Sequence, residues 1–182
     1  MKALFALALA FGLSAPAFTR AEETPPAPCR ESENARALDF WVGTFEVFIG
    51  DVKVGDNHIE RVVNGCAIIE NWVAASGGEG KSLFYFDAAA DTWTQVWVTG
   101  NTRALGGLKV KRFLGLGSDG TVQFQSEQAA PGGGTYLDRT TLTPLEGGSF
   151  RQLIEISGDG GETWRPTFDA VYRSKGGAPE TH

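Results

Sequence analysis

Few residues in this chain could carry acid–base or metal chemistry, and they are widely spaced. Catalysis usually needs titratable groups brought together with shifted pKa values. His58 stands beside a predicted turn with no second metal ligand in view, and His182 lies in a polar tail. No phosphate-binding loop and no nucleophile paired with a base is recognisable in the sequence. It therefore predicts no catalytic residue, no metal site and no cofactor.

Three glutamates stand within apolar segments, where an unpaired inward charge would be costly; they are Glu60, Glu70 and Glu155. With a two-residue loop at 64–65, Glu60 and Glu70 point to opposite faces of a sheet, whereas a bulged loop brings them together. One interpretation is a solvated sheet face. The other is a barrel lumen in which Glu60 or Glu70 pairs with Arg151 or Arg139 and anchors a polar group of a ligand.

Aromatic side chains are the more suggestive feature, and Trp72 and Tyr85 belong to this set. In the segment 91–99, Trp93, Gln95 and Trp97 share one face, because successive residues of a strand point to opposite sides. A barrel wide enough to contain a cavity would line it with such a face. Plain core packing explains the same pattern equally well.

These residues must be positioned by short segments rich in β-branched and aromatic residues, separated by glycine-rich turns. Only residues 32–38 have a helical pattern. The expected strands are 40–50, 57–63, 66–75, 81–87, 92–99, 104–115, 121–128, 135–143, 149–157 and 164–173. Sequential strands without a long crossover predict an all-β protein, a single antiparallel up-and-down β-barrel of eight to ten strands.

Two short motifs are also typical of β-propellers. Residues 86–94 are similar to part of a kelch repeat, and 157–164 match the Asp-box, S-x-D-x-G-x-T-W. A propeller needs several copies of its blade, and each motif occurs once. We therefore expect an isolated Asp-box hairpin in which Ser157 and Asp159 stabilise the turn and Trp164 packs beneath it, a structural role.

The N-terminus has the pattern of a secretory signal peptide, with Lys2, an apolar run and two small-residue cleavage sites. The expected organisation is a signal peptide at 1–21, a proline-rich leader at 22–37, the barrel domain at 38–174 and a flexible tail at 175–182. Cleavage after Ala21 would leave 14 basic and 22 acidic residues, a formal charge of −8. An acidic surface argues against nucleic acid and anionic lipid as partners, and no later stretch reaches the ~20 apolar residues of a membrane span.

Cys29 and Cys66 are the two cysteines. An exported chain meets an oxidising compartment, in which such a pair is usually joined. We expect a disulfide that fixes the leader to the barrel and contributes ~4 kcal/mol in the chain-entropy model. The alternative is two buried thiols.

Four motifs follow one another in the chain: Phe40-Trp41-Val42-Gly43-Thr44-Phe45, Asn64-Gly65-Cys66, Trp93-Thr94-Gln95-Val96-Trp97 and Phe168-Asp169-Ala170-Val171-Tyr172-Arg173. Their order resembles a bacterial family of exported proteins of unknown function that are related to the lipocalin-like, or calycin, β-barrels. The similarity covers 38–173.

Calycins open with Gly-x-Trp, and here Phe45 replaces the tryptophan. The resemblance implies that Arg173 packs across Phe45 to close the barrel. A haem-binding relative uses an axial histidine, which makes His58 a weak haem candidate.

We therefore expect a periplasmic or secreted lipocalin-like protein that binds or carries a small apolar or amphipathic ligand without covalent chemistry. The alternatives are a hydrolase or isomerase that uses a lumen carboxylate, and a structural or partner-binding barrel. The expected ligand-binding residues are Glu60, Glu70, Trp72, Tyr85, Trp93, Gln95, Trp97 and Arg151.

Overall fold

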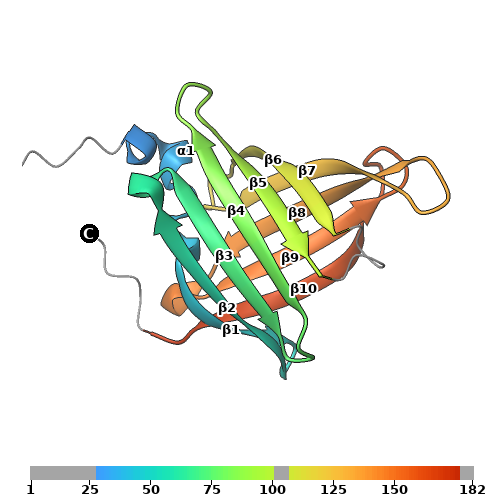
Figure 1. The fold of residues 1–182 in the computed structure, drawn as a ribbon, viewed down its shortest axis with the longest axis horizontal. Coiled ribbons are helices and arrows are strands. Elements are labelled where there is room, and N and C mark those ends of the chain that lie inside the picture. The colour runs from blue at the N-terminus through green and yellow to red at the C-terminus, as the bar shows by residue number, and fades with distance from the viewer. Residues whose placement is uncertain (1–27, 101–106, 177–182) are drawn as a thin grey trace, which may run out of the picture.

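A computed structural model describes residues 28–100 and 107–176, which form ten antiparallel strands and a few short helices (Figure 1). The predicted signal peptide, most of the predicted leader, His182 and most of the tail lie outside the described residues. The strands are β1 (Gly43–Ile49), β2 (Val52–Val62), β3 (Ala67–Ala74), β4 (Glu79–Asp87), β5 (Thr92–Thr99), β6 (Leu108–Leu116), β7 (Val122–Ala129), β8 (Thr135–Pro144), β9 (Phe150–Ser157) and β10 (Arg165–Ser174). The helix α1 is Glu33–Arg36, and the 3₁₀ turns are η1 (Pro28–Arg30), η2 (Asp39–Trp41), η3 (Val63–Gly65) and η4 (Glu146–Gly148).

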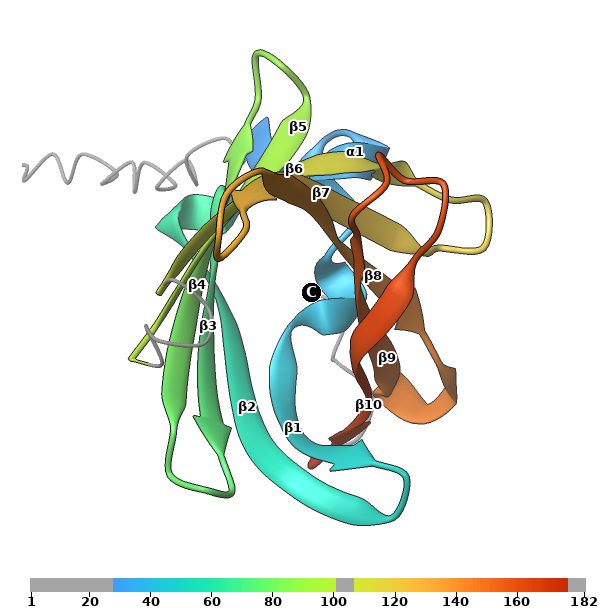
Figure 2. The ribbon, with the colours of Figure 1, turned by 90° about the vertical axis from the view of Figure 1, so that its right-hand side faces the viewer.

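Each strand pairs with its neighbour in sequence, and β1 pairs with β10 to close the barrel. Figure 2 shows the strands as a ring, with the helical turn η2 that leads into β1 inside it. The predicted up-and-down β-barrel is therefore confirmed. Among the described residues, no helix has the length and apolarity needed to cross a membrane.

One end of the barrel is filled by aromatic side chains. The ring of Trp41, carried in by η2, lies 4.5 Å from that of Phe84. Phe45 meets Phe150 edge to face at 5.0 Å, and Phe150 stacks on Tyr172 at 4.3 Å. All five side chains are at most 2% exposed. Because this layer is dry and closely packed, the lumen is blocked at that end.

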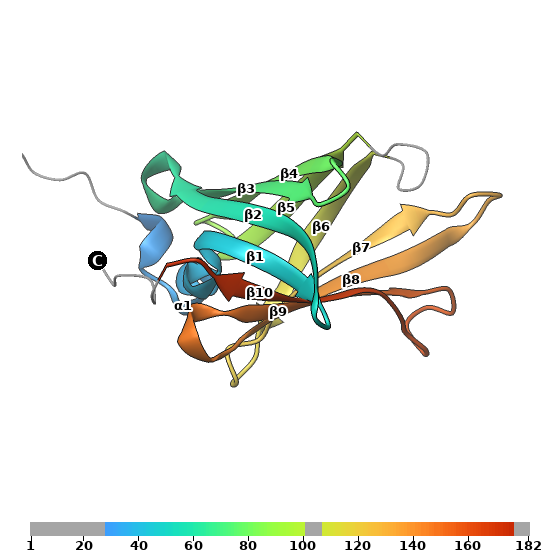
Figure 3. The same cartoon turned by 90° about the horizontal axis from the view of Figure 1, so that it is seen from below.

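The N-terminal segment closes the same end from outside. Ser32 caps α1 by accepting a hydrogen bond from the Ala35 amide at 3.0 Å. Trp93 donates its indole N–H to the Asn34 carbonyl at 2.7 Å, and Asn34 donates to the Asp91 carboxylate at 2.8 Å. Figure 3 shows α1 at one end of the barrel and the β7–β8 and β9–β10 hairpins extending at the other.

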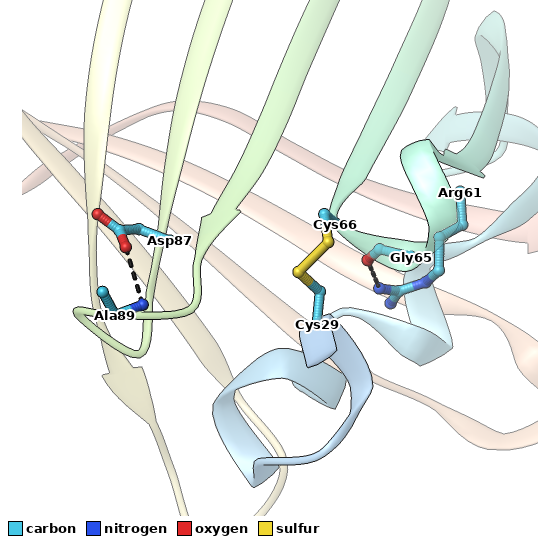
Figure 4. Close-up of a disulfide and its surroundings, with 6 residues drawn as sticks. All are labelled: Cys29, Arg61, Gly65, Cys66, Asp87 and Ala89. Atoms are coloured by element: carbon cyan, nitrogen blue, oxygen red, sulfur yellow. Dashed lines mark hydrogen bonds between the residues drawn. A yellow bond between two sulfur atoms is a disulfide. The ribbon is translucent and has the colours of Figure 1, made fainter. Parts of the chain in front are cut away.

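A disulfide joins Cys29 to Cys66, as predicted (Figure 4). It connects η1 to the residue that follows η3. Arg61 donates to the Gly65 carbonyl at 3.0 Å and so supports the same turn. The leader is thus fixed to the barrel covalently at the end that the aromatic layer blocks.

Arg173 contacts Phe48 and not Phe45, so the predicted partner is wrong. Its guanidinium carbon lies 4.0 Å above the centre of the Phe48 ring. Phe45 is 1% exposed and faces the lumen, whereas Arg173 is exposed on the outer face. Strand alternation explains the difference, because Phe45 and Phe48 are three residues apart and face opposite sides.

We expect Arg173→Ala to lower the free energy of unfolding by about 0.5–1 kcal/mol, the usual value for an exposed cation–π contact. Chemical denaturation of Arg173→Ala, Phe48→Leu and the double variant would measure the coupling between the two side chains. Strictly additive single effects would contradict the assignment. Because the pair lies outside the lumen, binding inside the barrel should not change.

The Asp-box forms the turn between β9 and β10. Asp159 accepts hydrogen bonds from the Ser157 hydroxyl at 2.6 Å and from the Thr163 amide at 3.0 Å. Trp164 donates to the Gly161 carbonyl at 3.0 Å, and the Arg139 guanidinium lies 3.8 Å above its ring. These donors hold the pKa of Asp159 below its usual range. The geometry is that of a turn-forming structural motif.

Candidate functional site

A cavity of about 280 Å³ occupies the lumen between the aromatic layer and the open end of the barrel. Its lining comes from six strands, β3, β5, β6, β8, β9 and β10, and combines aromatic, aliphatic and charged side chains. The lining residues are Glu70, Trp72, Gln95, Trp97, Lys109, Lys111, Thr140, Gln152, Ile154, Thr167, Phe168 and Tyr172. The volume is near the lower end of the ~300–1,000 Å³ typical of small-molecule sites.

The two tryptophans of the cavity lie over glycines of neighbouring strands. A Cβ at Gly55 would come within 2.5 Å of the Trp72 ring, and a Cβ at Gly80 within 2.0 Å of the Trp97 ring. No side chain larger than hydrogen therefore fits at either glycine without moving an indole. The β2 and β4 walls are thus kept free so that two flat apolar surfaces can line the lumen.

Glu70 is held in the cavity wall by neutral donors. Its two carboxylate oxygens accept from the Asn57 amide at 2.8 Å and the Ser82 hydroxyl at 2.6 Å. Burial raises the pKa of Glu70, and the two hydrogen bonds oppose that rise. Burial also raises the pKa of Tyr172 well above its usual range, with a smaller contribution from the Glu70 charge. This part of the cavity lining is therefore polar, and the ionised forms of both groups are disfavoured.

Two lysines on β6 share one aspartate on β8. Lys109 and Lys111 each donate to a different carboxylate oxygen of Asp138, and Lys111 also donates to the Thr140 hydroxyl at 2.6 Å. Asp138 is fully buried and Lys111 is 3% exposed. Burial lowers the pKa of Lys111 to about 8, although the attraction of Asp138 opposes this. Two ammonium groups thus line the cavity with a single carboxylate behind them.

Two amide oxygens of the lining have no hydrogen-bond partner among the described residues. They belong to Gln95 and Gln152, and both atoms are buried. The Gln95 amide donates to Ser82 at 3.2 Å, which connects it to the Glu70 group. Buried acceptors normally have a donor, so these oxygens are available to an N–H or O–H group of a molecule inside the barrel.

Comparison with protein-family models and with curated proteins finds no match to this chain. The properties of the site therefore rest on its geometry.

The cavity brings together four of the eight predicted ligand-binding residues: Glu70, Trp72, Gln95 and Trp97. Glu70 faces inward and Glu60 outward, because Ile59 pairs with Glu70 and Glu60 with Ile69. This is the opposite-face arrangement expected for a two-residue loop. The actual loop is four residues long, which leaves the same faces inside.

The other four predicted residues do not line the cavity. Trp93 shares the inner face of Gln95 and Trp97 but is fully buried beneath α1, where its ring packs against Phe86 at 5.2 Å. Tyr85, Glu60 and Arg151 lie on the outer face. In each strand the residues directly before and after them face the lumen, because successive residues point to opposite sides.

The predicted arginine partners of Glu70 are engaged elsewhere. Arg151 forms a bidentate ion pair with Asp169 at 2.7 Å on the surface, and Arg139 pairs with Glu155 at 3.0 Å. Glu70 is hydrogen-bonded to Asn57 and Ser82 instead.

Sequence reasoning missed the ionic cluster of Lys109, Lys111 and Asp138 and the cavity-lining residues Thr140, Gln152 and Tyr172. The available signal was one acid inside the segment 135–143 and two cations at i and i+2 inside 104–115. His58 is exposed and its Nδ1 lies 3.0 Å from the Thr44 hydroxyl, outside the lumen. Within 28–100 and 107–176, no three metal-binding side chains of the His, Cys, Asp and Glu types gather.

Proposed function

We propose that this protein is an exported, lipocalin-like barrel that binds or carries a small amphipathic molecule in its lumen. The observation that carries the proposal is the cavity itself, which combines apolar walls with buried acceptors that have no partner. Trp72, Trp97, Ile154 and Phe168 offer apolar surface, and burial of such surface contributes ~25 cal/mol per Å². Gln95 and Gln152 would orient the polar part of the molecule.

The same proposal includes the export of the protein to the periplasm or the cell exterior. The Cys29–Cys66 disulfide supports it, because disulfides persist in oxidising compartments. The signal-like N-terminal sequence supports it independently.

Binding is favoured over catalysis by the state of Glu70, the carboxylate that an enzyme would need. Both of its oxygens already accept hydrogen bonds, from Asn57 and Ser82. Neither partner is a titratable group, so among the described residues Glu70 is hydrogen-bonded to no second acid or base of a catalytic pair. The proposal therefore assigns Glu70 a structural and ligand-orienting role.

Titration with the uncharged fluorophore N-phenyl-1-naphthylamine tests the proposal, since its emission rises in an apolar site. We expect Trp97→Ala to weaken binding about ten-fold, because losing much of one indole contact removes ~1–3 kcal/mol. Trp164→Ala is the matched control, since Trp164 packs against Arg139 away from the cavity.

Circular dichroism should show that both variants remain folded. The proposal fails if the fluorophore does not bind, or if the Trp97 and Trp164 variants bind it equally.

A further inference from the structure

We propose that the polar end of the ligand is an anion, the carboxylate of a small organic acid, and that Lys109 and Lys111 bind it. This inference rests on the proposed function and names the chemical class of its ligand. The juxtaposition that carries it is two lysine ammonium groups in the cavity lining with one shared aspartate behind them.

The charges of this group do not balance. Lys109 and Lys111 bring two positive charges, and Asp138 supplies one negative charge. Asp138 is fully buried and does not line the cavity, whereas both lysines do. Because buried charges are costly unless they are paired, the surplus positive charge favours a second anion on the cavity side.

The lysines also have unused donors. An ammonium group has three N–H donors, and within the described residues Lys109 has one partner and Lys111 has two. A carboxylate offers two acceptor oxygens and could bind both lysines at once. Hydrogen bonds between charged groups are roughly twice as strong as neutral ones, so this contact would fix the orientation of the ligand.

The opposite wall carries one carboxyl group, Glu70. Glu70 faces the same cavity, but burial raises its pKa and so disfavours its charged form. The buried amide oxygens of Gln95 and Gln152 would accept from a hydroxyl or N–H group elsewhere on the ligand. The whole chain has a formal charge of −6, so non-specific attraction of an anion is not expected.

The test compares decanoate with 1-decanol, which have the same chain length but differ in charge. Each displaces bound N-phenyl-1-naphthylamine, and the dissociation constants follow from competition. We expect decanoate to bind at least ten-fold more tightly than 1-decanol to the unmodified protein. Lys109→Met should remove about ten-fold or more of the decanoate affinity and leave the affinity for 1-decanol nearly unchanged.

Lys109→Met is the primary variant because Lys111 still neutralises Asp138 in it. Lys81→Met is the matched control, since Lys81 is exposed on β4 and bonds to Asn71 on the outer face. If the fluorophore binds but decanoate and 1-decanol compete equally, the anion inference is overturned and the proposed function stands. If the fluorophore does not bind, the proposed function fails, and the anion inference that rests on it fails too.

The pH dependence gives a second readout. Lys111 faces Lys109 on β6, Asp138 on β8, and Glu70 and Tyr172 across the cavity. Because the Lys111 pKa is about 8 in the empty protein, raising the pH through that value removes positive charge. Decanoate affinity should therefore fall between pH 7 and 9.5, while 1-decanol affinity stays constant.

In the Glu70→Gln variant, decanoate affinity should still fall between pH 7 and 9.5. This result would separate the titration of Lys111 from that of Glu70. Lys111→Met should abolish the fall. A decanoate affinity that does not change with pH, or a fall of equal size for both competitors, would overturn the assignment to Lys111.

Discussion

Asp138→Ala should lower the free energy of unfolding by about 3–5 kcal/mol, the usual effect of removing one partner of a buried ion pair. The loss is large because Asp138 is the carboxylate that both lysines bind, and Lys111, which is 3% exposed, would have to stay charged without it or give up its proton. Urea denaturation at pH 7 measures it. A change below about 1 kcal/mol would show that the charges are solvated in the folded protein.

Two controls separate charge from packing. The triple variant Lys109→Met, Lys111→Met, Asp138→Leu should regain most of the lost stability, because apolar replacement of a buried ionic group is often neutral or stabilising. Asp138→Asn keeps the shape of the side chain and removes only its charge. If Asp138→Asn were as stable as the unmodified protein, the electrostatic explanation would be wrong.

The loss of stability caused by Asp138→Ala should also be smaller at high pH. The folded pKa of Lys111, about 8, is below the ordinary lysine value of 10.5, so between these values the unfolded chain binds more protons than the folded one. Stability from this group therefore rises with pH. Once Lys111 is neutral it needs no carboxylate, so Asp138→Ala should cost less at pH 9.5 than at pH 7.

Loss of the disulfide should have a similar effect at the other end of the barrel. Cys29→Ala with Cys66→Ala should lower the free energy of unfolding by ~4 kcal/mol, because the bond closes a loop with a sequence separation of 37. Denaturation of the double variant, and of the native protein with and without reductant, measures this. An effect below about 1 kcal/mol would show that the N-terminal segment of η1, α1 and η2 stays packed on the barrel without the bond.

Binding in the lumen provides the control for that variant. Cys29 packs in the aromatic core at the closed end, and neither cysteine lines the cavity. Where the protein remains folded, its affinity for N-phenyl-1-naphthylamine should match that of the native protein. A large loss of affinity would instead link the packing of this N-terminal segment to the shape of the cavity.

The strand order and the inner face of β5 could be predicted because local rules decide both. Glycine-rich turns between short β-branched segments favour hairpins, and the alternation of Trp93, Gln95 and Trp97 holds in the structure. The position of Trp93 could not be predicted, since it depends on α1 packing across the end of the barrel.

The cluster of Lys109, Lys111 and Asp138 could not be predicted from the sequence. Strand alternation divides the residues between two faces, but it does not say which face is inside the barrel. In β6, Lys109 and Lys111 alternate with Val110, a pattern usually read as lysine outside and valine inside. The structure has the reverse, with Val110 43% exposed and Lys111 buried. In a barrel with a polar lumen the lysines face inward and the valine faces outward. The lysines tolerate burial because they pair with Asp138. Asp138 is on β8, a strand that does not pair with β6. The same reversal places Tyr85 and Leu83 outside and Ser82 inside.

The closure of the barrel also determines the order in which the chain can fold. Among the described strands, nine pairings join sequence neighbours, and the β1–β10 pairing joins residues from opposite ends of the domain. Hairpins form quickly because their loops are short, whereas the β1–β10 contact must overcome the entropy of bringing distant segments together. Until that step, β1 and β10 are open edges that can pair with another chain. Slow closure would therefore be the stage at which this protein is most exposed to aggregation. Variants that weaken the β1–β10 pairing at Val47 and Tyr172 should aggregate more during refolding, in addition to losing native stability.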